Sequence, residues 1–349
     1  MPKLFLHAPN VHQGGGKSLL IALLAAVPGN VKSLVQLDSR MTLPANLPEN
    51  LTIKFVAPSI QQRLRAEWWL ARITQPQDTI LCFGNLPPLF KSRGHAVVFV
   101  QNRYLVDNVT LDDFPLKTRL RLWIERLWLS GRMANADEFV VQTSSMKRLL
   151  EARTKGIIPA RVLPFMANHG GYGRKMRQPE MQKEKKCDFL YVASGEPHKN
   201  HRQLIEAWCL LAKEGVFPLL KLTLDRVHFA ELSSWMEQKV EQYRLNVENA
   251  GSLPHCQVKE LYDRAGALIY PSTFESFGLP LIEARQAGLP VLASELDYVR
   301  DVLDPEQTFD PKSAVSIARA VKRFMGIEDK PSSLQDASGF MKHILERTE

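Results

Sequence analysis

The segment YPSTFESFGLPLIEARQAGLPVLAS, residues 270–294, is the most informative part of this chain. An apolar run is followed there by a polar loop that carries Glu275, and Gly278 then opens a segment of helical period that bears Glu283. A second apolar run, Val291–Ala293, comes after the next glycine. A buried strand, a helix and another buried strand in this order are typical of a parallel sheet covered by helices.

The same alternation extends through the rest of the chain. In the first half we expect strands at Leu4–His7, Ser33–Leu37, Thr52–Val56, Thr79–Phe83, Ala96–Val100 and Phe139–Gln142, and helices at Lys17–Ala26, Ile60–Ile73, Leu116–Met133 and Ser145–Thr154. In the second half we expect strands at Phe189–Val192, Leu219–Leu224, Val247–Ala250, Ala267–Tyr270 and Val291–Ala293, and helices at Arg202–Lys213, Ala230–Tyr243, Gln257–Arg264, Leu279–Gln286 and Ala314–Phe324. The sequence thus predicts an α/β fold of two doubly wound, Rossmann-like domains, with a ligand cleft between the carboxyl ends of their sheets.

One polar, basic stretch, NHGGYGRKMRQPEMQKEKK, interrupts this alternation after Phe165. Such a stretch, with glycines and few apolar residues, is typical of an interdomain linker. We therefore expect an N-terminal domain over residues 1–165, a linker over 166–186, a C-terminal domain over 187–330, and a tail over 331–349 that packs back or frays.

The composition is that of a globular protein. Hydrophobic residues make up 45% and charged residues 23% of the 349 positions, which argues against disordered, collagen-like and coiled-coil chains. The four cysteines lie far apart, so neither a disulfide framework nor a cysteine zinc site is indicated. The start of the chain lacks a signal-peptide pattern, and no apolar run approaches the ~18 residues of a spanning helix, so a cytoplasmic protein is expected.

Positive charge is concentrated in the first half. Residues 1–165 hold 21 Lys and Arg against 11 Asp and Glu, although the net charge of the whole chain is only +8. An anionic partner is indicated, and membrane surfaces, nucleic acids and phosphorylated substrates all qualify. No nucleic-acid-binding motif accompanies the charge, so nucleic acid is not expected.

Two helical segments of this basic half, IQQRLRAEWWLARI (60–73) and LKTRLRLWIERLWLSGR (116–132), interleave arginines with tryptophans. Helices that lie on anionic lipid headgroups have this composition. The alternative is that their apolar faces pack on the sheet while the arginines face water. The sequence leaves both open.

A glycine turn follows the first expected strand. Gly14, Gly15 and Gly16 precede a helical segment, so their backbone amides can face an anion or a sugar ring. Gly16-Lys17-Ser18 matches the end of the nucleotide phosphate-binding pattern GxxxxGK[ST], but Val11 stands where its first glycine is needed. A phosphate-loop ATPase is therefore disfavoured, and a plain tight turn remains the alternative to substrate contact.

Glu275 and Glu283 form a pair of carboxylates separated by seven residues. One lies on a loop at the expected cleft and the other one turn into the following helix, so both can reach one ligand. The helix start offers amides and a positive dipole end to a phosphate. The alternative is that Glu275 caps the helix and Glu283 is solvated.

The segment ESFGLPLIEA closely resembles the E-x7-E signature of retaining glycosyltransferases of the GT-B fold, in the glycosyl transferases group 1 family. Upstream, YVASGEPHKN (191–200) followed by LIEA (204–207) is similar to the first strand and loop of the family's donor domain. The glycine triplet is similar to the family's first loop. The resemblance implies a two-domain, metal-independent hexosyltransferase with a nucleotide-diphosphate sugar, GDP- or UDP-linked, as donor and no further cofactor.

Site residues follow from that resemblance. It implies that Glu275 contacts the donor sugar, Glu283 the ribose, and Lys199 the diphosphate, as the chemistry of carboxylates and ammonium groups allows. Donor contacts are further implied for Gly15, Gly16, Asn200, Ser276, Phe277, Gly278 and Leu279. Catalytic roles fall to Glu275, Lys199 and Asn102. Acceptor contacts are expected for His12, Arg103 and Tyr104, and because Arg103 and Tyr104 follow a predicted central strand, packing between the domains is the alternative for these two.

Two positions depart from the family pattern. Glu196 and Pro197 follow Gly195 where many members carry an arginine, which leaves Lys199 as the matched cation. Asn102 stands where a histidine is frequent, so only a hydrogen-bonding role is expected of it.

The implied reaction is transfer of a hexose, with retention, to a glycan or lipid-linked saccharide in cell-surface polysaccharide or lipopolysaccharide assembly, at the inner face of the membrane. A front-face route is usual in the resembled family, with the leaving phosphate helping to deprotonate the acceptor. A nucleotide-sugar epimerase on the same scaffold and a non-catalytic basic membrane or nucleic-acid-binding module are the alternatives.

Overall fold

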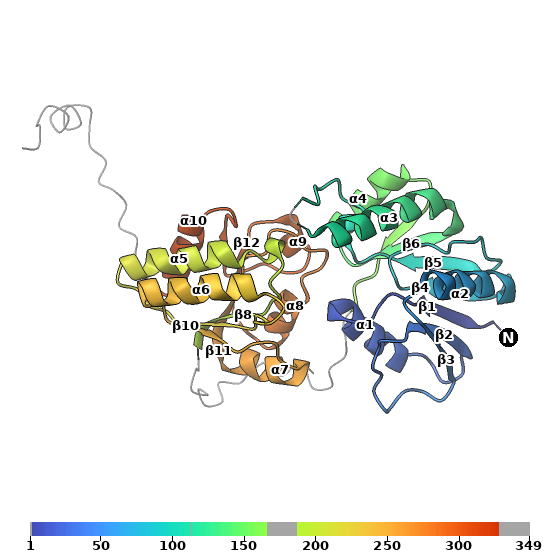
Figure 1. Ribbon diagram of the computed structural model, residues 1–349, viewed down its shortest axis with the longest axis horizontal. Helices are drawn as coiled ribbons and strands as arrows, with labels where there is room; N and C mark the ends of the chain where they lie inside the picture. The colour runs from blue at the N-terminus through green and yellow to red at the C-terminus, as the bar shows by residue number, and fades with distance from the viewer. Residues whose placement is uncertain (1, 113, 166–186, 328–349) are drawn as a thin grey trace, which may run out of the picture.

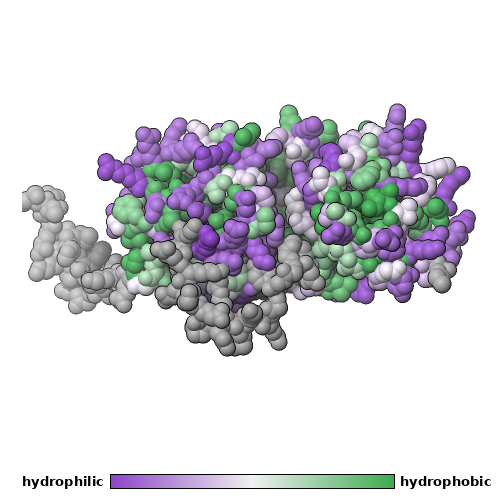
Figure 2. All heavy atoms as spheres, turned by 90° about the horizontal axis from the view of Figure 1, so that it is seen from below, coloured by the Kyte–Doolittle hydropathy of each residue, from purple (hydrophilic) through white to green (hydrophobic). Residues whose placement is uncertain are grey.

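The computed structural model describes residues 2–112, 114–165 and 187–327, which form two parallel sheets covered by helices (Figure 1). The predicted fold class is confirmed. The expected linker (166–186) and tail (331–349) lie outside the described residues. In the space-filling view the two halves stand side by side as two lobes (Figure 2).

The N-terminal sheet has seven parallel strands in the order β3-β2-β1-β4-β5-β6-β7. The strands are β1 (Leu4–Ala8), β2 (Ser33–Asp38), β3 (Leu51–Val56), β4 (Thr79–Cys82), β5 (His95–Phe99), β6 (Glu138–Val141) and β7 (Ala160–Val162). The helices are α1 (Gly14–Ala25), α2 (Ile60–Ile73), α3 (Leu116–Arg132) and α4 (Ser144–Thr154), with short 3-10 turns η1 (Arg103–Leu105) and η2 (Met133–Asn135). The strand order reverses between β1 and β4, so their carboxyl ends open a crevice.

The C-terminal sheet repeats this topology with six strands, in the order β10-β9-β8-β11-β12-β13. The strands are β8 (Cys187–Tyr191), β9 (Leu220–Leu222), β10 (Val247–Asn249), β11 (Ala265–Tyr270), β12 (Val291–Ser294) and β13 (Gln307–Phe309). The helices are α5 (His201–Lys213), α6 (Ala230–Tyr243), α7 (His255–Arg264), α8 (Leu279–Gln286), α9 (Asp297–Arg300) and α10 (Ala314–Phe324), with the 3-10 turn η3 (Pro197–Lys199). In this sheet the strand order reverses between β8 and β11, which opens the corresponding crevice.

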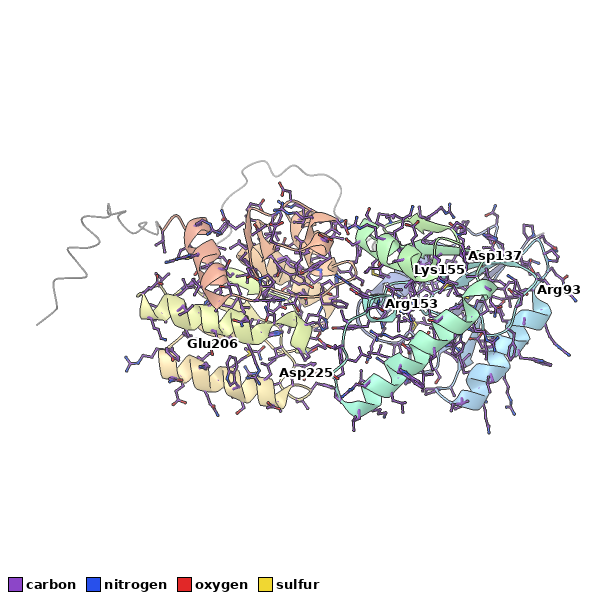
Figure 3. All side chains as sticks on the ribbon, turned by 90° about the horizontal axis from the view of Figure 1, so that it is seen from above. Arg93, Asp137, Arg153, Lys155, Glu206 and Asp225 are labelled. Atoms are coloured by element: carbon purple, nitrogen blue, oxygen red, sulfur yellow. The ribbon has the colours of Figure 1, made fainter. Side chains whose placement is uncertain are left out.

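Each face of the N-terminal sheet has its own core. On one face Leu20 and Leu24 of α1 pack with Leu6 of β1, and on the other Leu70 of α2 and Leu122 of α3 belong to a second cluster. Alternate strand residues point to opposite faces, which is why neighbours along β1 divide between the two clusters. Helices α2 and α3 therefore lie on the same face of the sheet, side by side (Figure 3).

Direct contacts join the two halves. The Thr143 hydroxyl donates to the Ser276 carbonyl at 3.2 Å, and the Ser145 amide donates to the Asp301 carboxylate at 3.0 Å. Tyr104 packs on Phe274 with ring centroids 4.4 Å apart. These contacts hold the carboxyl ends of the two sheets close to each other.

Candidate active site

A cavity of about 500 Å³ lies between the two halves, beside the two places where the strand order of a sheet reverses. Gly15 and Gly16 line it from the start of α1, and Gln101 and Gln142 from the ends of β5 and β6. The other half contributes the ends of β8 and β11 and the start of α8, with Ser194, Lys199, Glu275, Ser276, Phe277, Gly278, Leu279 and Glu283 among the lining residues. Both carboxylates singled out from the sequence thus face one space.

Glu275 is the most constrained of these side chains. Its Oε1 accepts hydrogen bonds from Lys199 Nζ at 2.6 Å, from Ser272 Oγ at 2.7 Å and from Tyr270 Oη at 2.9 Å. Burial raises the pKa of Glu275, but the charges of Lys199 and His198 and the hydrogen bonds from Lys199 and Ser272 outweigh it and hold the pKa below its ordinary value. Glu275 is therefore ionised at neutral pH and able to accept hydrogen bonds from sugar hydroxyls.

The loop that carries Lys199 is tied to the Glu275 loop through backbone groups. The His198 carbonyl accepts from the Thr273 amide at 2.8 Å and from the Thr273 hydroxyl at 3.2 Å. Because these bonds fix the two loops relative to each other, the ammonium group of Lys199 and the carboxylate of Glu275 meet at the cavity wall.

Glu283 lies one turn into α8 and lines the same cavity. Its Oε2 accepts from Tyr262 Oη at 3.1 Å, and its Oε1 lies 3.1 Å from His255 Nε2. Both partners come from α7, so that helix fixes the direction in which the carboxylate points.

The start of α8 fits an anion. Gly278 precedes the helix at φ +73°, a conformation that side chains rarely adopt, and a Cβ there would meet Leu281 Cδ1 at 2.9 Å. As a glycine, Gly278 has no side chain that could cap the helix. The amides of the first turn and the positive end of the dipole therefore face the cavity beside Lys199, where a diphosphate could be held.

The glycine turn lies opposite, across the interface. The helix α1 begins at Gly14 rather than at the expected Lys17, so Gly15 and Gly16 belong to its first turn. A Cβ on Gly15 would stand 2.9 Å from Leu279 Cδ1, so glycine permits the close approach of α1 to α8. Lys17 donates to Thr42 Oγ1 at 2.7 Å and is not among the cavity residues.

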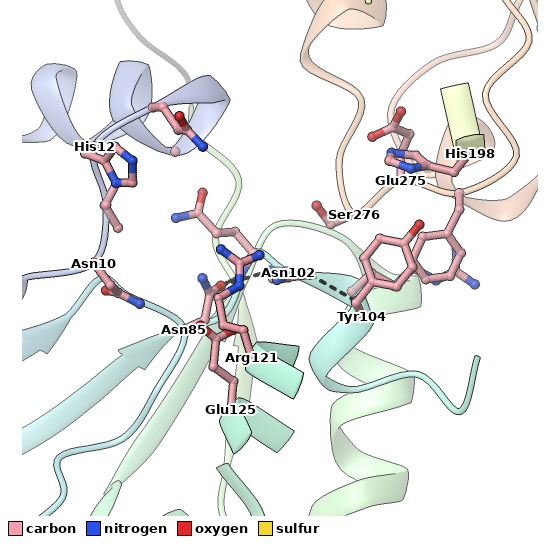
Figure 4. Close-up of a pocket in the computed structure, with 16 residues that line it drawn as sticks. Asn10, His12, Asn85, Asn102, Tyr104, Arg121, Glu125, His198, Glu275 and Ser276 are labelled. Carbon is pink, nitrogen blue, oxygen red and sulfur yellow. Dashed lines mark hydrogen bonds between the residues drawn. The ribbon is translucent and has the colours of Figure 1, made fainter. Parts of the chain in front are cut away.

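A second cavity of about 340 Å³ adjoins the first (Figure 4). Glu275 and Ser276 line both cavities, so a ligand in either one meets the same carboxylate. The second cavity is lined from the N-terminal half by polar and charged side chains, among them Asn10, His12, Asn85, Asn102, Arg103, Tyr104, Arg121 and Glu125.

The sequence-derived residues Asn102, Arg103 and Tyr104 all line this second cavity. Asn102 Oδ1 accepts from the Tyr104 amide at 3.1 Å and so caps η1 (Figure 4). The Arg103 guanidinium lies 4.4 Å from the centre of the Phe274 ring. Arg103 and Tyr104 therefore both pack between the halves and border the cavity, and the two readings of these side chains are compatible.

Two sequence-derived residues have partners of their own. The amide of Asn200 donates to the carbonyls of Pro271 at 3.0 Å and Pro311 at 2.6 Å, and Asn200 is not among the residues lining either cavity. We therefore expect it to shape the loops rather than to contact the donor. His12 lines the second cavity with its Nδ1 3.6 Å from Asp38 Oδ2.

Sequence reasoning missed the side chains that hold or surround these residues. Tyr270, Ser272, Tyr262 and His255 contact the two carboxylates, and Arg121 and Glu125 enter the second cavity from α3. Tyr270 could have been predicted to contact the site, because it ends a buried strand and a buried hydroxyl needs a hydrogen-bond partner. Arg121 gave no such signal in a helix with many arginines.

Residues 2–112, 114–165 and 187–327 contain neither a metal-binding cluster nor a membrane-spanning helix. No group of three or more His, Cys, Asp and Glu side chains there is arranged to hold a metal ion. No helix among the same residues is long and apolar enough to cross a membrane.

Residues 174–338 match the family model of glycosyl transferases group 1. Among curated relatives, O-antigen chain mannosyltransferase B of Escherichia coli is 30% identical over 138 residues, 37% of this chain and 34% of that protein. O-antigen chain mannosyltransferase RfbU of Salmonella typhimurium is 28% identical over 164 residues, 46% of this chain and 44% of that protein. The matches thus span less than half the length of these relatives.

Solved structures match over nearly the whole chain. Anabaena HepE in complex with UDP gives a TM-score of 0.68 at 15% identity and covers 93% of this chain and 90% of its own. Sucrose-phosphate synthase of Thermosynechococcus elongatus gives 0.65 at 16% identity, with the same shares of 93% and 90%. The resemblance to the group 1 family is confirmed for the segment 174–338, which matches the family model, and the described chain has a two-domain fold of the GT-B type.

Proposed function

We propose that this protein is a retaining glycosyltransferase that moves a hexose from a nucleotide-diphosphate sugar to a glycan or lipid-linked saccharide, in polysaccharide or lipopolysaccharide assembly. The observation that carries the proposal is the 500 Å³ cavity in which Glu275, Glu283, Lys199 and the start of α8 converge. A sugar, a ribose and a diphosphate need hydroxyl acceptors at both ends and positive charge between them. The group 1 family match supports the same assignment.

In the proposed reaction the bond between the anomeric carbon and the diphosphate oxygen breaks, and a bond to the acceptor oxygen forms on the same face of the sugar. The acceptor proton passes to the leaving phosphate. Glu275 orients the sugar through its hydroxyls, while Lys199 and the amides of Gly278 and Leu279 offset the charge that grows on the phosphate. We infer that this requires no metal ion, because these groups supply the neutralisation.

The second cavity supports transfer over epimerisation. An epimerase would need room for the nucleotide sugar alone, whereas the 340 Å³ space next to Glu275 can hold an acceptor. His12, Asn102, Arg103 and Tyr104 are the acceptor-side residues we propose, joined by Arg121 and Glu125. The expected site of action is the inner face of the membrane.

The O-antigen mannosyltransferase relatives favour a mannosyl donor. A thermal-shift series with GDP-mannose, UDP-glucose and ADP-glucose tests this, because a ligand that binds the folded state raises the melting temperature by an amount that grows with the logarithm of its concentration relative to its Kd. We expect selective stabilisation by one GDP- or UDP-sugar. Stabilisation by none of them would contradict the proposal.

Product analysis separates transfer from epimerisation. With the stabilising donor and a lipid-linked saccharide acceptor, we expect the free nucleotide diphosphate and an α-linked product from an α-linked donor. An altered sugar formed without acceptor would indicate the epimerase instead, and an inverted linkage would contradict retention.

A further inference from the structure

Helix α3 exposes large apolar side chains, whereas a surface helix usually exposes polar ones. It buries Leu122 and Leu129, while the opposite side carries large apolar residues whose exposed fractions lie between 49% and 80%. These are Leu116, Leu120, Trp123, Ile124 and Leu127. Their spacing of three and four residues puts them in one stripe along the helix.

Helix α2 repeats this arrangement beside it. Ile60, Leu64 and Trp68 follow each other at intervals of four and are all exposed. The two helices lie side by side on one face of the sheet (Figures 1 and 3), and the Arg63 guanidinium of α2 lies 5.2 Å from the centre of the Trp128 ring of α3. We call these eight exposed residues the docking face: Ile60, Leu64, Trp68, Leu116, Leu120, Trp123, Ile124 and Leu127.

Cations border the docking face. Lys117 and Arg121 lie on one side of the α3 stripe and Arg119 on the other, as the helical spacing requires. On α2 the Arg72 guanidinium lies 4.2 Å from the centre of the Trp68 ring. Apolar and tryptophan side chains between arginines and lysines are complementary to a bilayer interface, where acyl chains and anionic headgroups lie at successive depths.

We propose that the docking face binds the surface of a bilayer that contains anionic phospholipid. The apolar stripe enters the headgroup region, and the bordering cations contact lipid phosphates. The cations argue for this occupant over a second copy of the chain, because a symmetric contact through the same face would bring like charges together. Residues 1–165 hold 21 basic and 11 acidic residues, and this net positive charge also favours binding to an anionic bilayer.

Docking through α3 also fits the proposed acceptor. Arg121 and Glu125 on the flank of α3 line the 340 Å³ cavity, so a docked helix brings this cavity next to the lipid headgroups. A saccharide attached to a lipid could then enter the cavity while its lipid stays in the bilayer. This last step rests on the proposed function, whereas the docking itself does not.

Co-sedimentation of the full chain with vesicles tests the docking. We expect binding to vesicles of phosphatidylglycerol and phosphatidylcholine in equal parts, weak binding to pure phosphatidylcholine, and loss of binding as salt is raised. The variant L120Q/W123Q should lower the partition coefficient about tenfold, because it removes inserted apolar area. The variant R72E/K117E, at two of the bordering cations, should do so only for the anionic vesicles.

The matched control is F217Q/V315Q, which removes two side chains with exposed fractions of 50% and 49% from the C-terminal half. It should bind vesicles as the unmodified protein does. Equal losses in the control and in L120Q/W123Q, or binding that ignores lipid charge, would overturn the proposal. So would a dimer in solution that L120Q/W123Q converts to a monomer. Nucleotide-sugar binding is measured separately, so failure of one proposal leaves the other testable.

Discussion

Glu275 joins the two cavities, because it lines both and is held by three donors on one oxygen. Its second oxygen, Oε2, is the one we assign to the donor sugar. Glu283, held by α7 on the wall of the larger cavity, contacts only the nucleotide in this assignment. Substitutions of the two carboxylates are therefore expected to affect the kinetics in different ways.

Replacing Glu275 with glutamine keeps the volume and removes the charge. We expect kcat to fall by about a hundredfold or more, as when a group that stabilises the transition state is lost, with little change in melting temperature. The matched variant Glu283→Gln should raise KM for the donor and leave kcat nearly unchanged. Steady-state kinetics on both variants provides the test, and equal effects on kcat would refute the division of roles.

Lys199 controls the charge state of Glu275. Its charge is the largest influence that opposes burial and holds the pKa of Glu275 below the ordinary value. The carboxylate is thus present above that pKa and lost as the pH falls through it, so activity should fall on the acid side. In Lys199→Met that pKa rises and the acid limb of kcat/KM should move to higher pH. Lys239→Met removes a lysine paired with Glu206 instead and should leave the profile unmoved.

Glu67, which lies outside the two cavities, makes the free energy of unfolding depend on pH. Its carboxylate is buried, lies 2.9 Å from His7 Nε2, and accepts from Arg63 Nε at 2.9 Å. Burial raises its pKa, but His7, Arg63 and the Leu89 amide lower it to about 2. The depressed pKa contributes about 3 kcal/mol, present above the unfolded pKa and lost as the pH falls towards 2. Urea unfolding across this range should show a flatter pH dependence in Glu67→Gln than in the unmodified protein.

At the scale of elements, sequence periodicity was sufficient where a segment has both an apolar face and a clear end. The helices Ile60–Ile73, Ala230–Tyr243, Leu279–Gln286 and Ala314–Phe324 have the predicted bounds. The short edge strand β13 (Gln307–Phe309) was missed, because three residues that contain a glutamine and a threonine carry no periodic signal.

The start of α1 and the side chains around the carboxylates needed the structure. Three glycines in succession argue against helix, yet α1 begins at Gly14, because its first turn is packed against the other half at Leu279. The apolar stripe of α3 was open to two readings from sequence alone. Which side of the helix faces the sheet depends on tertiary packing, and Leu122 and Leu129 take that place.

Helix α3 also positions the loop that leads into the second cavity. Arg126 donates to the carbonyls of Tyr104 at 2.7 Å, Val109 at 3.1 Å and Asp107 at 3.2 Å. In Arg126→Ala these partly buried carbonyls lose a charged donor, which costs about 1–3 kcal/mol. Hydrogen exchange of residues 104–109 should speed up. Arg132→Ala, at the end of the same helix, is the control and should leave that segment protected, whereas equal exchange in both variants would exclude the anchoring role.

At the scale of the whole molecule, aromatic contacts stand out beside the cavities among those that join the described parts of the two halves. Phe274 of the C-terminal half meets Tyr104 at 4.4 Å between ring centres and the Arg103 guanidinium at 4.4 Å. Tyr104 also meets His198, at 5.7 Å. Small interfaces between domains allow relative motion, so these contacts are expected to stabilise the closed arrangement.

Replacing Phe274 with alanine should therefore shift the molecule towards more open arrangements. We expect a larger radius of gyration in small-angle X-ray scattering and a higher KM for the acceptor, because the second cavity is formed by both halves. The dissociation constant of the donor should change little, since most of the proposed donor contacts come from the C-terminal half. Phe217→Ala, which truncates an exposed phenylalanine of the same half, controls for the loss of a ring. If Phe274→Ala kept the original radius of gyration and weakened donor and acceptor equally, the ring would act on the site directly rather than through closure.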